Sequence, residues 1–362
     1  MVAETLTNAR RFSKSRLPVR RLPRLAKKPA MPNIPDRPAG IDRGCIAGDA
    51  VRLVTFRHRA TGDRDRVGAL IDGDGAVVDL GISPGGPAFD SMLALIRAGD
   101  EALAAARFAS ASSKADAVVA AEEIALRTPL PEPPQIRDCL CFEEHLKRAF
   151  EVMRKSRGDG SPGMFEIPEI WYRQPIYYKA NRLAVVGHEE DVLWPGYADV
   201  MDYELEFGFF IGAGGRDIAK RDARAHIFGY SVFNDFSARD AQAREMPGGL
   251  GPGKGKDFDT GNVIGPCIVT ADELDPYDCT MIARVNGEEW SRGHSGTIHW
   301  TFEDLIAHVS QSETLHPGEF FGSGTVGGGC GLELGRYLSQ GDVIELEVEG
   351  IGVLRNRLIR EA

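Results

Sequence analysis

The sequence of 362 residues has few of the features that mark membrane, secreted or metal-thiolate proteins. No stretch reaches about 18 uninterrupted apolar residues, so no membrane span is predicted. The six cysteines include no Cys-x-x-Cys pair, and no secretory signal is present, so a disulfide framework is not expected. Cys139 and Cys141 alternate with apolar residues, which predicts small buried side chains in a strand and not a soft-metal site. We therefore expect a reducing, cytoplasmic compartment.

Acidic residues are scarce at the N-terminus. Residues 1–43 hold 11 Lys and Arg but only three acids, and six prolines spread through them argue against a long amphipathic helix. A targeting peptide, a nucleic-acid arm and a disordered extension all share this composition, and Met31 is an alternative start. We predict a disordered, basic, Pro-rich tail over residues 1–47 with no assigned function.

The rest of the chain lacks the charge of a nucleic-acid-binding protein. Beyond residue 43, 32 basic residues stand against 50 acidic ones, and the whole chain carries −10. Basic and aromatic residues are not interleaved, so binding of nucleic acid through the basic arm is the weaker hypothesis. Hydrophobic content of 43% and charged content of 27% are those of an ordinary globular protein.

The chain divides at a proline-rich segment. Short alternating runs between residues 51 and 81, joined by Gly and Asp turns, predict a small β unit. Residues 91–109 and the Ala-rich stretch up to Ala125 have helical spacing. Four prolines within residues 128–134 indicate a linker, so we predict a small N-terminal domain over 48–132.

Residues 133–362 combine many short strand patterns with few helices. A helix is predicted over 143–156, and Asn286-Gly287 predicts a type I′ hairpin turn. Neither a βαβ rhythm nor an internal repeat is present. The prediction is a strand-rich α+β fold in which a curled mixed β-sheet, or β-roll, forms one continuous domain.

An acidic pair interrupts the most apolar part of this domain, in the segment YELEFG at 203–208. Side chains alternate along a strand, so Glu204 and Glu206 project to the same side. Neighbouring carboxylates repel each other, and a hard divalent cation with oxygen ligands is the simplest compensation. Asp235, at the end of the next apolar run, can supply a third carboxylate. A solvated acidic face on an edge strand is the alternative, but the apolar flanks favour a buried metal site.

Other polar residues cluster nearby in the sequence. Asp138 begins DCLCFEEH and His145 follows seven residues later, although either residue taken alone is more often structural. Arg239, Asp240 and Gln242 follow Asp235 in a helix-like turn.

Two loops are rich in glycine. Lys256 lies in the loop 248–262, whose first part fits GxxxxGK, but Gly255 stands where a Ser or Thr should hold Mg²⁺ and no helix pattern follows. Nucleotide binding is therefore not favoured. The loop 157–166, rich in Gly, Pro and Asp, is a candidate lid.

Five motifs together resemble the fumarylacetoacetate hydrolase family over about residues 128–362. They occur in the order and at the spacing typical of that family, and they are RDxxxFEEH, YELEFGFFIG, FNDFSARDAQ, GKxFDTGNxIGP and FGSGTVGGGCGLEL. DCLCFEEH aligns without a gap to the fumarylacetoacetase branch, and SARDxQ and YELE are the most specific of the motifs.

The resemblance implies a set of site residues. It implies a Mg²⁺ site, with Ca²⁺ or Mn²⁺ as alternatives, formed by Asp138, Glu204, Glu206 and Asp235. It implies His145 as the base that activates water and Glu333 as the carboxylate that orients it. Groups that contact substrate or stabilise developing charge would be Arg239, Gln242 and Lys256. Groups that hold the substrate's carboxylate and carbonyl oxygens would be Arg154, Tyr178 and Thr325.

Each implied role has a structural alternative. Glu333 could be a solvated acid, Tyr178 and Thr325 could serve packing alone, and Arg239 could form a salt bridge to Asp240 or Glu206.

The reaction implied is hydrolysis of a C–C bond in a 1,3-diketo acid, such as an acylpyruvate or a fumarylacetoacetate-like compound, by a homodimer. Such an acid chelates a hard cation through two oxygens, and a His–carboxylate pair can take a proton from water near neutral pH. Isomerisation or decarboxylation of 2-oxo acids, dehydration of 2-keto-3-deoxy sugar acids and a non-catalytic metal-binding role are the alternatives. A non-catalytic relative would lose the histidine dyad, and this chain has both members.

Two departures from the family pattern limit the resemblance. Met246 replaces a tyrosine that contacts substrate in the fumarylacetoacetase branch, and a Met cannot donate a hydrogen bond. Arg148 stands where shorter members carry an acid three residues after the histidine. A His–carboxylate dyad must therefore use the distant Glu333, as in the longer branch.

Overall fold

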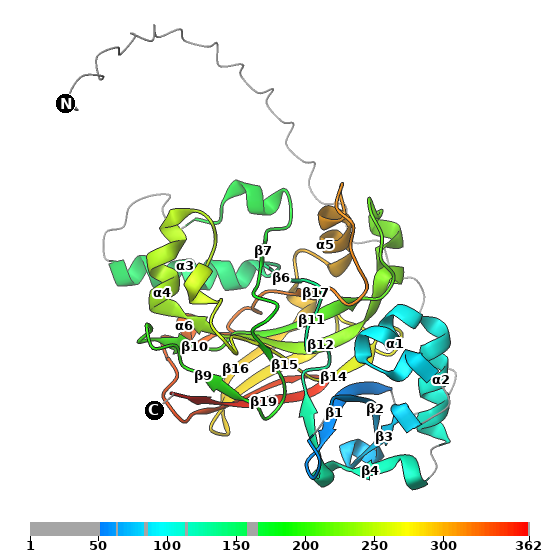
Figure 1. Cartoon of the computed structure of the whole chain (residues 1–362). Coiled ribbons are helices and arrows are strands. Elements are labelled where there is room, and N and C mark those ends of the chain that lie inside the picture. The colour runs from blue at the N-terminus through cyan, green and yellow to red at the C-terminus, as the bar shows by residue number, and fades with distance from the viewer. Residues whose placement is uncertain (1–50, 63, 83–85, 113–114, 158–165, 361–362) are drawn as a thin grey trace, which may run out of the picture. The chain divides into compact units, whose positions relative to one another are not determined.

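Strands β11 (Leu205–Ile211) and β12 (Ile227–Asp235) lie at the centre of the molecule and are buried along their whole length. The computed structural model describes residues 51–360, apart from 63, 83–85, 113–114 and 158–165 (Figure 1). The tail predicted over residues 1–47 and nearly all of the predicted lid lie outside the described residues. The segment Gly48–Ala362 forms one compact unit.

The largest sheet has twelve strands, ten of them in the order β4-β3-β2-β1-β14-β12-β11-β17-β6-β7, with β5 pairing β1 and β8 pairing β14. Its N-terminal strands are β1 (Arg52–His58), β2 (Arg66–Ile71), β3 (Ala76–Asp79), β4 (Val118–Ala120) and β5 (Ile124–Arg127). Its other strands are β6 (Ile136–Cys139), β7 (Tyr177–Lys179), β8 (Val185–Val186), β14 (Asn262–Thr270) and β17 (Phe320–Gly322), beside β11 and β12.

A five-stranded sheet in the order β16-β15-β18-β19-β9 packs against the first, and β10 and β13 form a separate pair. These strands are β9 (Asp191–Leu193), β10 (Met201–Asp202), β13 (Ser237–Ala238), β15 (Thr280–Val285), β16 (Glu288–His294), β18 (Val343–Val348) and β19 (Gly352–Ile359). The helices are α1 (Met92–Ala98), α2 (Asp100–Ala111), α3 (Glu143–Arg157), α4 (Arg239–Glu245), α5 (Phe302–Val309) and α6 (Gly331–Leu334). The predicted strand-rich α+β fold is confirmed.

Most of the predicted elements are present. The hairpin turn joins β15 to β16, and Asn286 and Gly287 have the positive φ angles of 52° and 80° that a type I′ turn requires. The helix predicted over 91–109 is two helices, because Gly99, with φ of 68°, ends α1. The prediction that the Ala-rich stretch up to Ala125 is helical is wrong at Val118–Ala120 and from Ile124 onward, while Ala115–Ala117 and Ala121–Glu123 are short 3-10 turns. There β4 pairs with β3 and β5 with β1, because pairing at a sheet edge outweighs the weak helical preference of this stretch.

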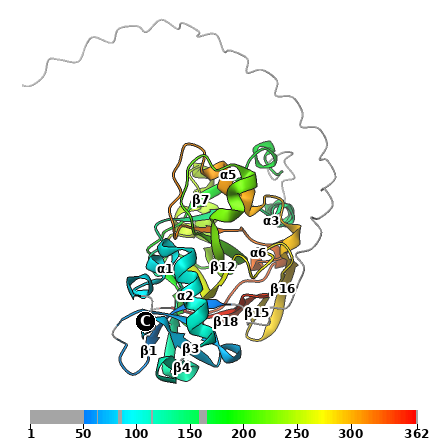
Figure 2. The same cartoon turned by 90° about the vertical axis from the view of Figure 1, so that its right-hand side faces the viewer.

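The predicted boundary near residue 132 divides one continuous sheet, because β1 pairs with β14. Figure 2 shows α1 and α2 beside the strands β1–β4, and their apolar side chains share a core with that face of the large sheet. The division into domains 48–132 and 133–362 stays a prediction. Among the described residues, no helix is both long and apolar enough to cross a membrane.

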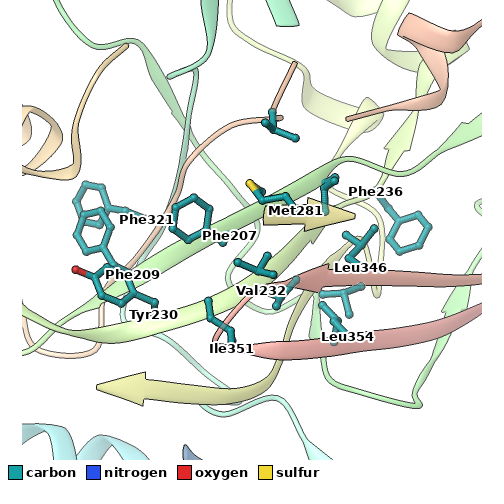
Figure 3. Close-up of a cluster of buried hydrophobic side chains, with 14 of the residues drawn as sticks. Phe207, Phe209, Tyr230, Val232, Phe236, Met281, Phe321, Leu346, Ile351 and Leu354 are labelled. Atoms are coloured by element: carbon teal, nitrogen blue, oxygen red, sulfur yellow. The ribbon is translucent and has the colours of Figure 1, made fainter. Parts of the chain in front are cut away.

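The main core lies between the two sheets. Figure 3 shows Phe207 and Tyr230 of the large sheet in one cluster of buried side chains with Met281 and Leu346 of the five-stranded sheet. Phe302 of α5 lies against the rings of Phe207, Phe209 and Tyr230, at centroid distances of 4.8–5.9 Å. Because β11 is buried on both faces, the solvated alternative for Glu204 and Glu206 is wrong, and both acids need partners inside the protein.

Candidate active site

Three buried carboxylates meet where adjacent strands of the large sheet end. Asp138 lies on β6, Glu206 on β11 and Asp235 on β12, with β17 between β6 and β11. One oxygen from each of these acids lies within 4.8 Å of the others. Gly322 on β17 leaves room for this approach, because a Cβ there would lie 2.5 Å from Oδ1 of Asp138.

These acids fit a divalent cation. The Oδ1 atoms of Asp138 and Asp235 are buried and accept no hydrogen bond from the described residues. Burial and the nearby Asp235 carboxylate raise the pKa of Asp138 well above its usual value. Burial and the carboxylates of Asp138 and Asp235 do the same to the pKa of Glu206. Mg²⁺, Ca²⁺ and Mn²⁺ prefer oxygen ligands, and a cation bound here would compensate the repulsion among these carboxylates.

Glu204, the fourth predicted ligand, is paired with two cations. Its Oε2 accepts a hydrogen bond of 2.6 Å from Nζ of Lys256, and its Oε1 lies 2.8 Å from Nη2 of Arg239. Burial opposes ionisation, but these two cations lower the pKa of Glu204 to about 2. Lys256 also donates to the Oδ2 of Asp235 at 2.6 Å and to its backbone oxygen at 2.8 Å. Lysine has three donors, so all of them are used.

Tyr178 and Thr325, two of the three residues predicted to bind substrate, form hydrogen bonds to carboxylates of the site. The hydroxyl of Tyr178 donates to Oδ2 of Asp235 at 2.7 Å, and Oγ1 of Thr325 donates to Oε1 of Glu206 at 3.2 Å. The backbone N–H of Gly324 donates to the other oxygen of Glu206 at 2.9 Å. Gly324 has φ of 76° and lies against the Cys139 carbonyl, where a Cβ would be 2.3 Å from that oxygen. Packing alone therefore does not describe Tyr178 and Thr325.

His145 and Glu333 form a hydrogen-bonded pair beside the acids. Nδ1 of His145, on the first turn of α3, lies 2.7 Å from Oε1 of Glu333 on α6. The Glu333 side chain is fully buried and also accepts a 2.7 Å bond from the N–H of Gly328, so it is not a solvated acid. A carboxylate only accepts, so Nδ1 donates, and in the neutral ring Nε2 carries the lone pair. His145 lies close enough to the acids for its positive form to lower the pKa of Glu204.

The remaining predicted residues differ in their placement. Gln242 accepts a 3.0 Å hydrogen bond from Nη1 of Arg239 and so joins the site. Arg154 lies nine residues after His145 on the unbroken helix α3, which turns about 100° per residue and carries them to opposite sides. Arg154 instead lines a cavity of about 390 Å³ with Lys147 and Tyr172. The structure does not bring Arg154 to the site.

The salt bridge considered for Arg239 has other partners. Arg239 pairs with Asp202 and Glu204, whereas Asp240 pairs with Arg244. Arg148 forms an exposed hydrogen bond to Glu144 on α3. The carboxylate that bonds His145 is that of Glu333.

Sequence reasoning missed two side chains that contact the site. The thiol of Cys330 lies 3.4 Å from Oε1 of Glu333, and Asp202 accepts from the backbone of α6 and from Arg239. Asp202 could have been found from alternation, since it precedes Glu204 by two residues. The one sequence signal for Cys330 was its position directly before the GLEL motif.

The sequence is similar to that of known proteins. The family model described as fumarylacetoacetate (FAA) hydrolase C-terminal matches residues 136–359. The human protein named oxaloacetate tautomerase FAHD2A, mitochondrial, is 36% identical over 193 residues, which are 52% of this chain and 60% of that protein. The matched part thus spans under two thirds of that relative.

Solved structures share the fold over most of the chain. The fumarylacetoacetate hydrolase from Exiguobacterium antarcticum superposes with a TM-score of 0.67 at 26% identity, covering 86% of this chain and all of that one. The maleylpyruvate hydrolase from Sphingobium sp. SYK-6, solved with manganese(II) and pyruvate, superposes with a TM-score of 0.64 at 22% identity, covering 86% of this chain and all of that one. The shared motifs, the fold and the family model together show that this chain is an enzyme of the fumarylacetoacetate hydrolase family.

Proposed function

We propose that this chain is a metal-dependent hydrolase that cleaves a C–C bond in a 1,3-diketo acid, such as an acylpyruvate or a fumarylacetoacetate-like compound. The observation that carries the proposal is the His145–Glu333 pair, which leaves a basic nitrogen beside a cluster of acids suited to a divalent cation. Whole-protein activity and substrate remain proposals for this chain.

Asp138, Glu206 and Asp235 would hold the cation, and Glu204 would complete the acidic set. When bound, Mg²⁺ or Mn²⁺ supplies Lewis-acid polarisation of a substrate carbonyl. The site suits such a cation because two of its buried carboxylate oxygens accept no hydrogen bond from any residue that the structure describes.

The dyad would move the proton of the reacting water. Nε2 of His145 takes a proton while the water oxygen bonds to the carbonyl carbon farther from the carboxylate. The bond from that carbon to the neighbouring methylene then breaks, and its electron pair stays on the methylene carbon. Return of the proton to that carbon yields a carboxylic acid and an oxo acid, which is a 2-oxo acid from an acylpyruvate and a 3-oxo acid from a fumarylacetoacetate-like compound. Glu333 holds the ring and stabilises the imidazolium that forms. Proton transfer by a positioned base such as His145 typically contributes about 10²–10⁴-fold in rate.

The buried cations would stabilise the charge that develops. Arg239 and Lys256 lie within 2.8 Å of Glu204, and both side chains are buried. A fixed positive charge in such a region acts more strongly than in water. Lys256 uses all its donors on acids, so we propose that it acts mainly through its charge.

A second candidate is keto–enol tautomerisation of oxaloacetate, favoured by the name of the human relative. It needs the same base and cation, but His145 would take a proton from carbon and no water would add. Isomerisation or decarboxylation of another 2-oxo acid, and dehydration of a 2-keto-3-deoxy sugar acid, would use the same residues.

The test follows the ultraviolet absorbance of acetylpyruvate, fumarylpyruvate, fumarylacetoacetate, oxaloacetate and a 2-keto-3-deoxy sugar acid, with Mg²⁺, with Mn²⁺ and with EDTA. Wild type is compared with His145→Ala and with His294→Ala, whose side chain is 46% exposed. Cleavage of a diketo acid into two acids that needs the metal and His145 supports the proposal. Enol loss from oxaloacetate without cleavage of any diketo acid would replace it with the tautomerase.

The homodimer and the cytoplasmic compartment stay predictions. The human relative is named as mitochondrial, and that statement belongs to the relative.

A further inference from the structure

Asp202 connects the dyad with the acidic cluster. It is fully buried at the end of the short strand β10, and each of its oxygens is used. Oδ1 accepts from the N–H of Gly331 at 2.7 Å, and Oδ2 accepts from the N–H of Leu332 at 2.9 Å. These two N–H groups begin α6, the helix turn that carries Glu333.

The same carboxylate also holds Arg239. Oδ2 of Asp202 accepts a 2.8 Å bond from Nε of Arg239, and Nη2 of that guanidinium lies 2.7 Å from the same oxygen. Arg239 forms an ion pair with Glu204, Glu204 with Lys256, and Lys256 with Asp235, at distances of 2.6–2.8 Å. An alternating chain of buried charges therefore runs from the helix of Glu333 to the acids that fit a cation.

The fit around Asp202 is tight. A Cβ on Gly331 would lie 2.5 Å from Oδ1 of Asp202 and 2.0 Å from the carbonyl oxygen of Arg336. Only a glycine lets the backbone of α6 come this close to the acid. The Arg336 N–H in turn donates to the Gly331 oxygen at 3.0 Å, so the segment closes around β10.

We propose that Asp202 is a positioning residue for catalysis. By accepting two hydrogen bonds from the backbone of α6 and one from Nε of Arg239, it sets where Glu333 stands relative to Glu204 and Asp235. Asp202 touches neither His145 nor substrate in this proposal, which rests on the proposed function of the dyad. A displacement of about 1 Å in such a group typically lowers the rate on the order of 100-fold.

The principal test is Asp202→Asn, which keeps the size but turns one acceptor into an NH₂ group facing existing donors. The control is Asp79→Asn. Asp79 is equally buried, pairs with Arg66 at 2.5 Å and accepts from the N–H of Gly81 at 2.9 Å, but lies in the N-terminal part of the sheet. Its loss therefore measures the effect of removing a buried acid away from the site.

Two readouts are made, one of which needs no substrate. The proton on Nδ1 of His145 is followed by NMR, where its bond to a carboxylate shifts it downfield and His145→Ala identifies it. kcat and KM are measured on the best substrate of the panel. We expect Asp202→Asn to move or abolish the resonance and to lower kcat about 100-fold with KM within about threefold. Asp79→Asn should lower the melting temperature without either effect.

The proposal is overturned if Asp202→Asn keeps both the resonance and kcat, or if Asp79→Asn changes them as much. Should Asp202→Asn fold incorrectly, Gly331→Ala is the second variant, because its new Cβ would clash with Oδ1 of Asp202 while the carboxylate is kept. It must then move or abolish the His145 resonance and lower kcat as well. A wild type that turns over no compound would contradict the proposed function, while the resonance would still decide the role of Asp202.

Discussion

Nδ1 of His145 and Oε1 of Glu333 lie 2.7 Å apart although 188 positions separate them in the chain. The hydrogen bond joins the first turn of α3 to α6, so its formation depends on the whole arrangement of strands between them. The two elements carry the base and its partner, and the acids that fit a cation lie on the strands beside them.

Replacing Glu333 should disable the base without unfolding the protein. Glu333→Gln keeps the size but cannot balance the positive charge that His145 acquires, so kcat should fall on the order of 100-fold. The control is Glu144→Gln, which changes an exposed acid on α3, beside His145, that bonds to Arg148. Rates within threefold of wild type for Glu333→Gln would contradict the dyad.

A divalent cation should stabilise the protein against heat. Binding only to the folded state at 100 times the dissociation constant contributes about 2.7 kcal/mol, so Mg²⁺ or Mn²⁺ should raise the melting temperature. Glu206→Gln removes one ligand and should abolish most of that rise. In EDTA, the same variant should be at least as stable as wild type, because it relieves repulsion from Asp138 and Asp235.

Calorimetric titration of the metal checks the same point directly. Asp217→Asn, which changes an exposed acid outside the cluster, is the control. A metal-induced rise that persists in Glu206→Gln would place the cation elsewhere.

Removing the charge of Lys256 should destabilise the fold. Lys256→Met leaves Glu204 and Asp235 without their shared cation, and breaking a buried ion pair typically costs about 3–5 kcal/mol. Denaturant unfolding in EDTA measures the loss, with Lys254→Met in the same loop as the exposed control. Added Mg²⁺ should restore part of the stability, because the cation compensates the same acids. A loss no larger than that of the control would show that Lys256 is not their main compensation.

The core between the sheets should depend on Phe302. This side chain is fully buried against four aromatic rings, and truncating a buried Phe to Ala typically costs about 3–5 kcal/mol. Phe108, which is 73% exposed, provides the matched substitution Phe108→Ala with little expected change. Equal midpoints for the two variants in urea would contradict this account of the core.

Patterns among neighbouring residues were enough to predict most helices and strands and some of the site residues. Alternation in YELEFG placed Glu204 and Glu206 on one side of a strand, and Asn286-Gly287 specified a turn, because both depend on neighbouring residues alone. The order of motifs identified the family and its sheet.

Tertiary structure decided what those rules could not reach. The Ala-rich stretch became β4 and β5 because neighbouring strands needed partners, and Arg154 left the site because α3 continues unbroken past it. Glu204 met its two cations only when segments 35 and 52 residues away were brought beside it, and Asp202 acquired its contacts with α6 across about 130 residues. Sequence spacing determines which side of a strand or helix a residue occupies, but the packing of distant elements determines what that side meets.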